Sequence, residues 1–233
     1  MSEAPSGTKL SLIRAAGELF AQRGLEGASI RAIADRAGAN IAAINYHFGT
    51  KENLYTEVLR YIASNQADRG VPEYLEDARL GSREGIAGIV ADIVEGRFAT
   101  YLSSGNPTWF GQLMLRAMLE PSESLQSVVE QFFKPDLDAY KAIMIRALPR
   151  LSDQEAEFMA YSLVGQVAFY VFARTPILVA HGKQEYDASY LRDASRHVTK
   201  VMLNALGLPV GGAEVLESVV SEAVEAEAQS DEV

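Results

Sequence analysis

The sequence of 233 residues predicts an all-α fold, in which a domain of three short helices precedes a larger helical domain. Apolar residues recur at spacings of three and four along most of the chain, as in helices that bury one face. Glycines and capping residues divide the first segment into short helices, whereas later breaks coincide with proline, which removes a backbone donor. Residues 168–172, Ala-Phe-Tyr-Val-Phe, favour a strand by composition but lie within a longer helical pattern.

The composition excludes several classes of protein. Hydrophobic residues make up 48% of the chain and charged residues 22%, as in ordinary globular domains. The absence of cysteine excludes disulfides and thiolate nucleophiles, and three histidines leave little material for a metal site or a catalytic triad. The chain also lacks a phosphate-binding loop, a nucleophile elbow and an HExxH motif. It is therefore predicted not to be an enzyme and to carry no cofactor and no metal.

The same reasoning predicts where the protein works. No apolar run approaches the roughly 20 residues that cross a bilayer, so no membrane contact is expected. The first residues lack the basic and apolar regions of a secretory signal, which predicts a cytoplasmic protein.

Three short helices are predicted between residues 8 and 48. Thr8 caps the first, Ser29 caps the second, and Asn40 caps a third that reaches Phe48. Two short helices joined by a turn that contains Gly38 have the helix-turn-helix arrangement, whose second helix enters the major groove of DNA.

The spacing also predicts which face of the third helix is exposed. Ile44 and Phe48 are one turn apart and should face a core that includes Ile33, Leu19 and Phe20. The side chains left pointing outward are Ala42, Ala43, Tyr46 and His47. Small alanines let a helix backbone come close to the duplex, and a methyl group can meet a thymine methyl.

Several polar residues near this face are candidates for contacts with DNA. The Asn45 amide suits adenine, or alternatively a hydrogen bond within the turn. Tyr46, His47 and Lys51 can donate to phosphates, and Arg31 can reach the backbone or a base from the groove rim. Solvated surface charge is the alternative interpretation of the two cations.

Charge is distributed unevenly along the chain. The net charge is −10, but residues 1–60 carry seven Lys/Arg and six Asp/Glu. The acid therefore lies mainly beyond residue 60, which leaves the N-terminal segment free to present a local basic face.

Beyond the short helices the sequence predicts a helical C-terminal domain. A connecting helix over 51–67 is followed by a loop over 70–82 and by long helices over 83–104, 107–119, 122–148, 153–174 and 187–206. The predicted domains are residues 1–50, residues 51–208 and an acidic tail over 209–233, which is a mobile tail or one more amphipathic helix.

Residues 9–60 resemble the DNA-binding domain of the TetR family of bacterial transcriptional regulators. Several residues match the family's pattern at the same relative spacing. They are Leu19-Phe20, Gly24, Ser29, Ile33-Ala34, Gly38, Tyr46-His47-Phe48, Lys51-Glu52 and Leu54. Asn45 stands where many members have tyrosine, and this variant is similar to the subgroup related to the CerR/CecR regulators. The resemblance implies an all-helical dimer, usually a repressor, whose C-terminal domain binds a small molecule and thereby releases operator DNA. It places groove or phosphate contacts at Arg31, Asn40, Ala42, Ala43, Asn45, Tyr46, His47 and Lys51.

A homodimer on a palindromic operator is expected, because one helix-turn-helix buries too little surface for tight specific binding. The last two long helices carry apolar stripes that suit either a symmetric interface or the core of one chain. The resemblance favours the interface, formed by Ala160, Val164, Val167, Ala168, Val171, Val198 and Met202.

A small apolar or amphipathic effector is expected among aromatic and methionine side chains, which make adaptable walls. Each of these side chains is also a candidate for the core. The candidates are Trp109, Phe110, Met114, Met118, Tyr140, Met144, Tyr161, Gln166, Phe169 and Tyr170. The alternatives to a repressor are a transcriptional activator and a helical protein-binding module without DNA binding.

Overall fold

A computed structural model describes residues 7–64, 70–102, 107–119 and 123–210 of the chain. Helices and short connections account for these ranges, and they contain no strand, which confirms the predicted all-α fold. Residues 168–172 are helical. The predicted acidic tail lies, from residue 211 onward, outside the described residues.

The chain forms two compact units, and neither is continuous in sequence. The first unit comprises Met1–Asp68, Ala99–Pro135 and Phe169–Gln184, and the second comprises Arg69–Phe98, Asp136–Ala168 and Glu185–Val233. The boundary predicted between residues 50 and 51 falls inside the first unit. Helices from the second half of the chain therefore belong to the same compact unit as the N-terminal helices.

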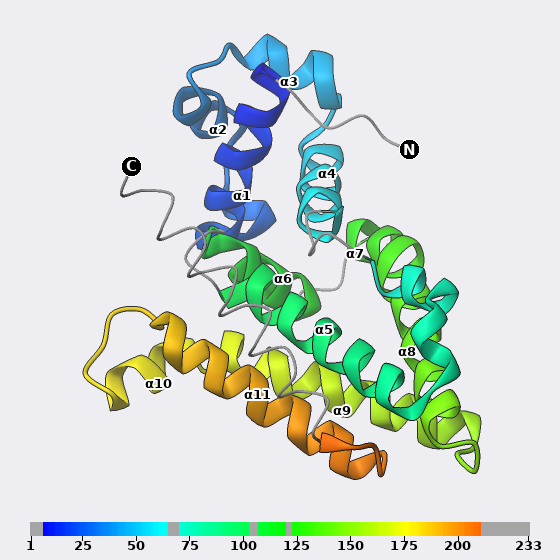
Figure 1. Cartoon of the computed structure of the whole chain (residues 1–233). Helices are drawn as coiled ribbons and strands as arrows, with labels where there is room; N and C mark the ends of the chain where they lie inside the picture. Colours follow the sequence, from blue (N-terminus) through cyan, green and yellow to red (C-terminus); the bar gives the residue numbers. More distant parts are fainter. Residues whose placement is uncertain (1–6, 65–69, 103–106, 120–122, 211–233) are drawn as a thin grey trace, which may run out of the picture. The chain divides into compact units, whose positions relative to one another are not determined.

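The N-terminal helices of the first unit follow the predicted order (Figure 1). They are α1 (Thr8–Gly27), α2 (Ile30–Ala37), α3 (Ile41–Phe48) and α4 (Lys51–Ser64). The prediction that Thr8 caps α1 is wrong, because Thr8 is already helical and Gly7 occupies the cap. The backbone of α1 kinks at Gly24, at a φ of 72°, and the helix resumes to Gly27.

The predicted caps of α2 and α3 are confirmed. Ser29 Oγ accepts a hydrogen bond from the backbone N–H of Ala32 at 3.2 Å, and Asn40 Oδ1 accepts one from Ala42 at 3.0 Å. Gly38 ends α2 in the left-handed conformation, at a φ of 64°, which an L side chain adopts with strain. These caps fix where each short helix begins and ends, and so fix the turn between them.

The rest of the first unit adds helices that the sequence places far away. They include α6 (Trp109–Leu119), α7 (Glu123–Val128), a π-helical turn η3 (Val129–Phe133) and α10 (Arg174–Ala180). The π turn interrupts the single helix predicted over 122–148, and the remainder of that helix is α8 (Lys134–Ala147). Pro176 was expected to end a helix, but it lies in the first turn of α10, where its missing N–H is no loss.

Trp109 and Phe110 anchor α6 to the N-terminal helices. Both side chains are buried in the same core as α1 and α4, and the Phe110 and Tyr61 rings meet edge to face with centroids 5.9 Å apart. Gly17 of α1 faces the indole so closely that a Cβ atom there would overlap the ring. A glycine at this position therefore allows α1 and α6 to pack.

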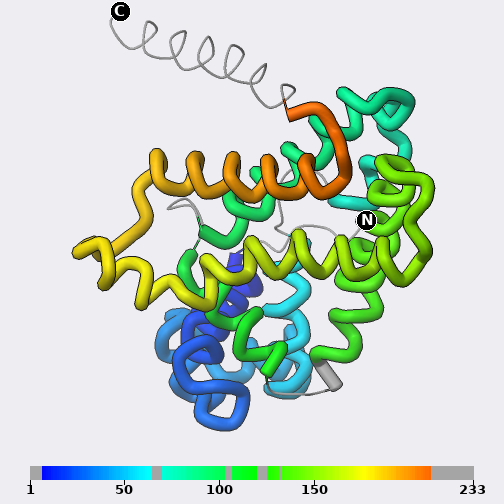
Figure 2. Tube along the Cα trace, turned by 90° about the horizontal axis from the view of Figure 1, so that it is seen from below, coloured from blue at the N-terminus to red at the C-terminus, as the bar shows by residue number. Residues whose placement is uncertain are grey.

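The second unit holds most of the remaining helical segments, although the last residues of α5 and α9 belong to the first unit. The predicted loop over 70–82 contains two 3₁₀ turns, η1 (Val71–Glu76) and η2 (Ala78–Gly81), and is followed by α5 (Arg83–Leu102), α9 (Asp153–Phe172) and α11 (Ala188–Ala205). Figure 2 shows α9 and α11 running alongside each other, and Gln166 Nε2 lies 3.3 Å from Met202 Sδ between them. Arg83 Nη1 donates to the carbonyl oxygen of Ala147 at 3.3 Å, which ties the start of α5 to the end of α8.

The Gly17 contact predicts a large effect from a small substitution. Gly17→Ala should destabilise the protein by about 1–3 kcal/mol, because the added methyl group must displace the indole or separate α1 from α6. Urea denaturation followed by the fluorescence of Trp109, the only tryptophan in the sequence, measures this directly.

Gly88→Ala is the matched control. Gly88 also lies within a helix, but a Cβ atom there makes an ordinary contact, 3.5 Å from the Arg79 side chain. This variant should be as stable as the wild type or slightly more stable. Equal stability of the Gly17 and Gly88 variants would contradict the packing described for α1 and α6.

Candidate nucleic-acid interface

The orientation of α3 is set by two buried side chains. Ile44 is fully buried and Phe48 is 8% exposed, and both lie in one core with Ile33, Leu19 and Phe20. This confirms the face that the spacing predicts to be buried. It turns the opposite side of α3 outward.

The outward side of α3 is exposed in the structure. Tyr46 is 85% exposed, and Ala42, Asn45 and His47 are also exposed. Ala43 is the exception, because it is half-buried and packs against the core. Ile41, at the start of the helix, is 41% exposed.

The two asparagines of this segment have different roles. The side-chain oxygen of Asn40 accepts the hydrogen bond that caps α3, so the amide nitrogen is its group available to DNA. The Asn45 side chain makes no hydrogen bond with the described part of the chain. Of the two predicted uses for Asn45, the bond within the turn is therefore absent, and the amide is free for a ligand.

Basic side chains flank this surface. Arg31 projects from the first turn of α2 with 83% of its side chain exposed, 4.0 Å from Asp35, at a distance where an exposed pair contributes little. Lys51 is half-buried at the first position of α4. Thr50 Oγ1 accepts a hydrogen bond from the backbone N–H of Asn53 at 3.1 Å and so caps α4.

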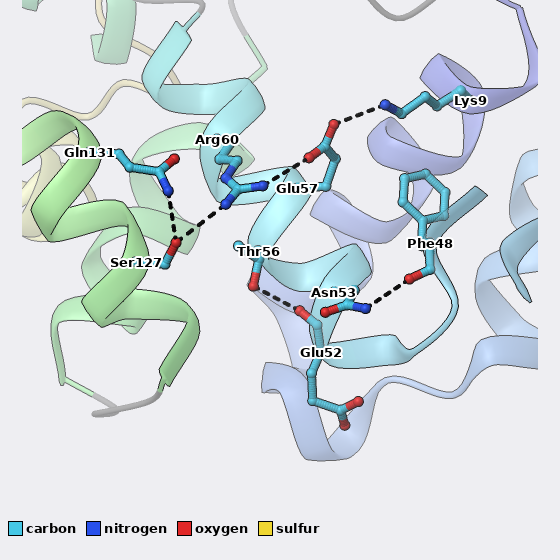
Figure 3. Close-up of polar contacts among 9 residues, drawn as sticks. All are labelled: Lys9, Phe48, Glu52, Asn53, Thr56, Glu57, Arg60, Ser127 and Gln131. Carbon is cyan, nitrogen blue, oxygen red and sulfur yellow. Dashed lines mark hydrogen bonds and ion pairs between the residues drawn. The ribbon is translucent and has the colours of Figure 1, made fainter. Parts of the chain in front are cut away.

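A chain of polar contacts runs along α4 (Figure 3). Lys9 Nζ donates to Glu57 at 3.0 Å, and the other oxygen of Glu57 lies 3.7 Å from Arg60 Nη1. Arg60 Nη2 donates to Ser127 Oγ at 3.3 Å, and Gln131 Nε2 donates to the same oxygen at 3.2 Å. No sequence pattern indicates the contacts of Lys9 with Glu57 and of Arg60 with Ser127, because they join residues 48 and 67 positions apart.

At the other end of α4 the contacts hold the helix-turn-helix. Asn53 Nδ2 donates to the carbonyl oxygen of Phe48 at 3.0 Å, and Lys9 lies 6.0 Å from the centroid of the Phe48 ring (Figure 3). The last residue of α3 is thus attached to both α1 and α4, and a displacement of α4 would act directly on α3.

The expected dimer residues divide by burial. Ala160, Val167, Val198 and Met202 are buried within the chain, so their side chains have no area left for a partner, whereas Val164, Ala168 and Val171 are half-buried. The exposed apolar residues of α9 are instead Phe158, Tyr161, Phe169 and Phe172, which fall on one side of the helix at 3.6 residues per turn. Sequence reasoning missed them because it sought small aliphatic residues.

The ten candidates for effector contacts divide between the two units. The first unit holds Trp109, Phe110, Met114, Met118, Phe169 and Tyr170, and the second holds Tyr140, Met144, Tyr161 and Gln166. Trp109 and Phe110 are buried in the core shared with α1 and α4, and Tyr140 and Met144 are also buried. Met118, Tyr161 and Phe169 are exposed.

A polar cluster in the second unit was also missed. Arg97 forms an ion pair with Asp136, and its Nε donates to the hydroxyl of Tyr140 at 3.0 Å. Burial raises the pKa of Asp136, and the positive charge of Arg97 opposes that shift without cancelling it. No periodicity links residues 39 positions apart, so the sequence could not pair them.

The described ranges offer neither a metal site nor a single helix that could span a membrane. No group of three or more His, Asp and Glu side chains there could hold a metal ion. No single described helix is long and apolar enough to cross a membrane, and α9 and α10 meet the criteria of length and composition only as a pair bent by 61°.

Two family models match the chain. The model of the tetR family of bacterial regulatory proteins matches residues 12–58, which include α2 and α3. The model of the C-terminal domain of the HTH-type transcriptional dual regulator CecR matches residues 89–206, about half of the chain.

Individual relatives agree with these matches. The HTH-type transcriptional dual regulator CecR of Shigella flexneri is 27% identical over 186 residues, which cover 77% of this chain and 82% of the relative. The HTH-type transcriptional repressor KstR2 of Rhodococcus jostii is 42% identical over 55 residues, 24% of this chain and 27% of that relative.

Solved structures share the fold. The TetR family regulator PfmR of Thermus thermophilus has a TM-score of 0.60 at 16% identity, over 83% of this chain and 97% of that chain. A transcriptional regulator from Rhodococcus has a TM-score of 0.56 at 24% identity, over 85% and 97%. The family matches and the exposed second helix of a helix-turn-helix lead to one conclusion: the chain belongs to the TetR family, with a C-terminal domain of the CecR type, and is a DNA-binding regulator of transcription.

Proposed function

We propose that the protein is a dimeric repressor that binds a palindromic operator through α3 and leaves it when a small apolar or amphipathic molecule binds the C-terminal helices. The observation that carries the proposal is the outward face of α3, where the Asn45 amide has no partner in the described chain and Tyr46 is 85% exposed. A chromosomal operator implies a protein that works in the cytoplasm.

Each candidate residue has a role in this proposal. Ala42 and Asn45 meet base edges, while Tyr46, His47 and Lys51 donate to phosphates on either side. Arg31 reaches the backbone from the start of α2, and Asn40 donates its amide to a phosphate while its oxygen caps the helix. Ala43, half-buried, contributes by keeping the backbone of α3 close to the groove.

The proposed signal passes through the first unit. An effector among the candidate side chains would shift α6 or α7, and each contacts the DNA-binding helices. The α6 contact is Trp109 against Gly17, and the α7 contact is Ser127 with Arg60 on α4. An effector acts only if it binds the DNA-incompetent arrangement more tightly than the competent one.

The proposed dimer uses the exposed face of α9. Gly165 lies between Tyr161 and Phe169 on this face, and a Cβ atom built there meets nothing within 4 Å. Aromatic residues flanking an open glycine suit close packing against a second copy of the same helix.

A transcriptional activator is the second candidate, and one comparison favours it. The relative that aligns over 77% of this chain is named a dual regulator, whereas the repressors AcnR and KstR2 align over only 28% and 24% of it. The sign of control is set by where the operator lies relative to the promoter.

Two substitutions test the DNA contacts. Tyr46→Phe should weaken operator binding by about tenfold, because it removes only the hydroxyl that donates to a phosphate. Lys51→Ala should lower the magnitude of the slope of log affinity against log salt by about two, because the dimeric variant leaves one phosphate of each half-site without its cation. Fluorescence anisotropy with an operator selected from random duplexes, over a range of salt, measures both.

Arg150→Ala is the control for these variants. Arg150 is an exposed cation between α8 and α9, away from the DNA-binding helices in sequence, and its removal should leave the salt slope unchanged. Unchanged affinity and slope in both the Tyr46 and Lys51 variants would mean that another surface binds DNA.

The dimer face gives a separate prediction. Phe169→Asp should convert the protein to a monomer, because it places a charge on a side chain that is 59% exposed in one chain and buried in the proposed dimer. Operator affinity should then fall about 100-fold or more, because a monomer cannot engage both half-sites at once. Leu75→Asp, also at an exposed apolar residue, should remain a dimer in analytical ultracentrifugation, and a dimeric Phe169 variant would refute the interface.

The sign of control is tested with a reporter. Supplying the protein should lower expression from a promoter that overlaps the selected operator, because the bound dimer excludes polymerase. Tyr46→Phe should relieve this repression in proportion to its reduced affinity. Raised expression from the same promoter would favour the activator.

A further inference from the structure

The exposed surface of α3 is apolar at the N-terminal end of the helix. At 3.6 residues per turn, Ile41 lies beside Asn45, and Ala42 lies beside Tyr46. Ile41 is the first residue of the helix, and N-terminal residues of a recognition helix contact base edges. This large aliphatic residue keeps 41% of its surface exposed and so has apolar area left for a ligand.

The chemistry of this surface narrows which bases it can read. Guanine is read chiefly by arginine or lysine, which donate two hydrogen bonds to O6 and N7. Residues 41–48 include neither, nor glutamine. With Tyr46 and His47 assigned to phosphates, the groups that α3 offers to base edges are aliphatic carbons and one free amide, which match the thymine methyl and the adenine edge.

We infer that Ile41 reads a thymine in each operator half-site, by packing its side chain against the 5-methyl group in the major groove, while Asn45 reads an adenine beside it. The inference rests on the proposed function and deepens it, because it names a class of operator: half-sites centred on A·T base pairs. Ile41 is then a specificity-determining residue beyond the eight DNA contacts assigned above.

The experiment removes the thymine methyl group from the DNA and, separately, the Ile41 side chain that is inferred to contact it. An operator is selected from random duplexes with the full-length protein at fixed salt. Each thymine of the half-site is then replaced in turn, in both half-sites together, by deoxyuridine, which lacks only the 5-methyl group. Affinities of wild type and Ile41→Ala are measured by anisotropy on every duplex, and thermal unfolding checks that the variant folds.

Replacement of thymine by deoxyuridine should weaken binding at one position of the half-site. The wild type should lose about fourfold in affinity per half-site at one position, which corresponds to burial of one methyl group. Ile41→Ala should bind the thymine duplex more weakly and lose the difference between thymine and uracil at that position alone. Lys51→Ala should bind more weakly on both duplexes and keep the difference, because a phosphate contact carries no base information.

The outcomes separate this inference from the function on which it rests. If the protein binds its selected operator and no uracil substitution weakens binding, or if Ile41→Ala keeps the full thymine preference, the inference is wrong and the proposed function stands. If no duplex is enriched over nonspecific DNA, the proposed function fails and the inference fails with it. An Ile41→Val variant that keeps part of the preference would support the methyl contact.

Discussion

Burial of Ile44 and Phe48 is the constraint on which the DNA-binding surface depends. An eight-residue helix is too short to be stable alone in water, so α3 exists because these side chains enter the core beneath it. The same two contacts fix the rotation of α3 about its axis. Every exposed residue on it, from Ile41 to His47, owes its direction to that burial.

The core beneath α3 is not closed by the N-terminal helices alone. Trp109 and Phe110 of α6 fill part of it, and Gly17 gives the indole its space. A three-helix domain buries too little surface to be more than marginally stable, so the added aromatic residues contribute substantially to it. The stability of the DNA-binding helices and the position of α6 are therefore linked, and an effector that moves α6 has a direct route to α3.

The sequence predicted the features that depend on neighbouring residues. Spacing placed Ile44 and Phe48 in the core, and side-chain chemistry identified Ser29 and Asn40 as caps. It did not predict that Trp109 packs on Gly17 or that Arg97 pairs with Asp136, because these contacts join segments remote in sequence and leave no periodic pattern. The π turn at Val129–Phe133 was missed for a related reason, since its composition resembles that of an ordinary helix.

Polar contacts join α4 both to α3 and to α7, which suits a switch. Toward α3, the Asn53 amide donates to the carbonyl oxygen of Phe48 at 3.0 Å, and toward α7 the Arg60 guanidinium donates to Ser127 Oγ at 3.3 Å. The buried Nε of Arg60 has no hydrogen-bond partner in the described part of the chain, a cost that the arrangement must offset. A movement of α7 would therefore reach α4 through Arg60 and α3 through Asn53, so that α3 keeps its shape and changes its position.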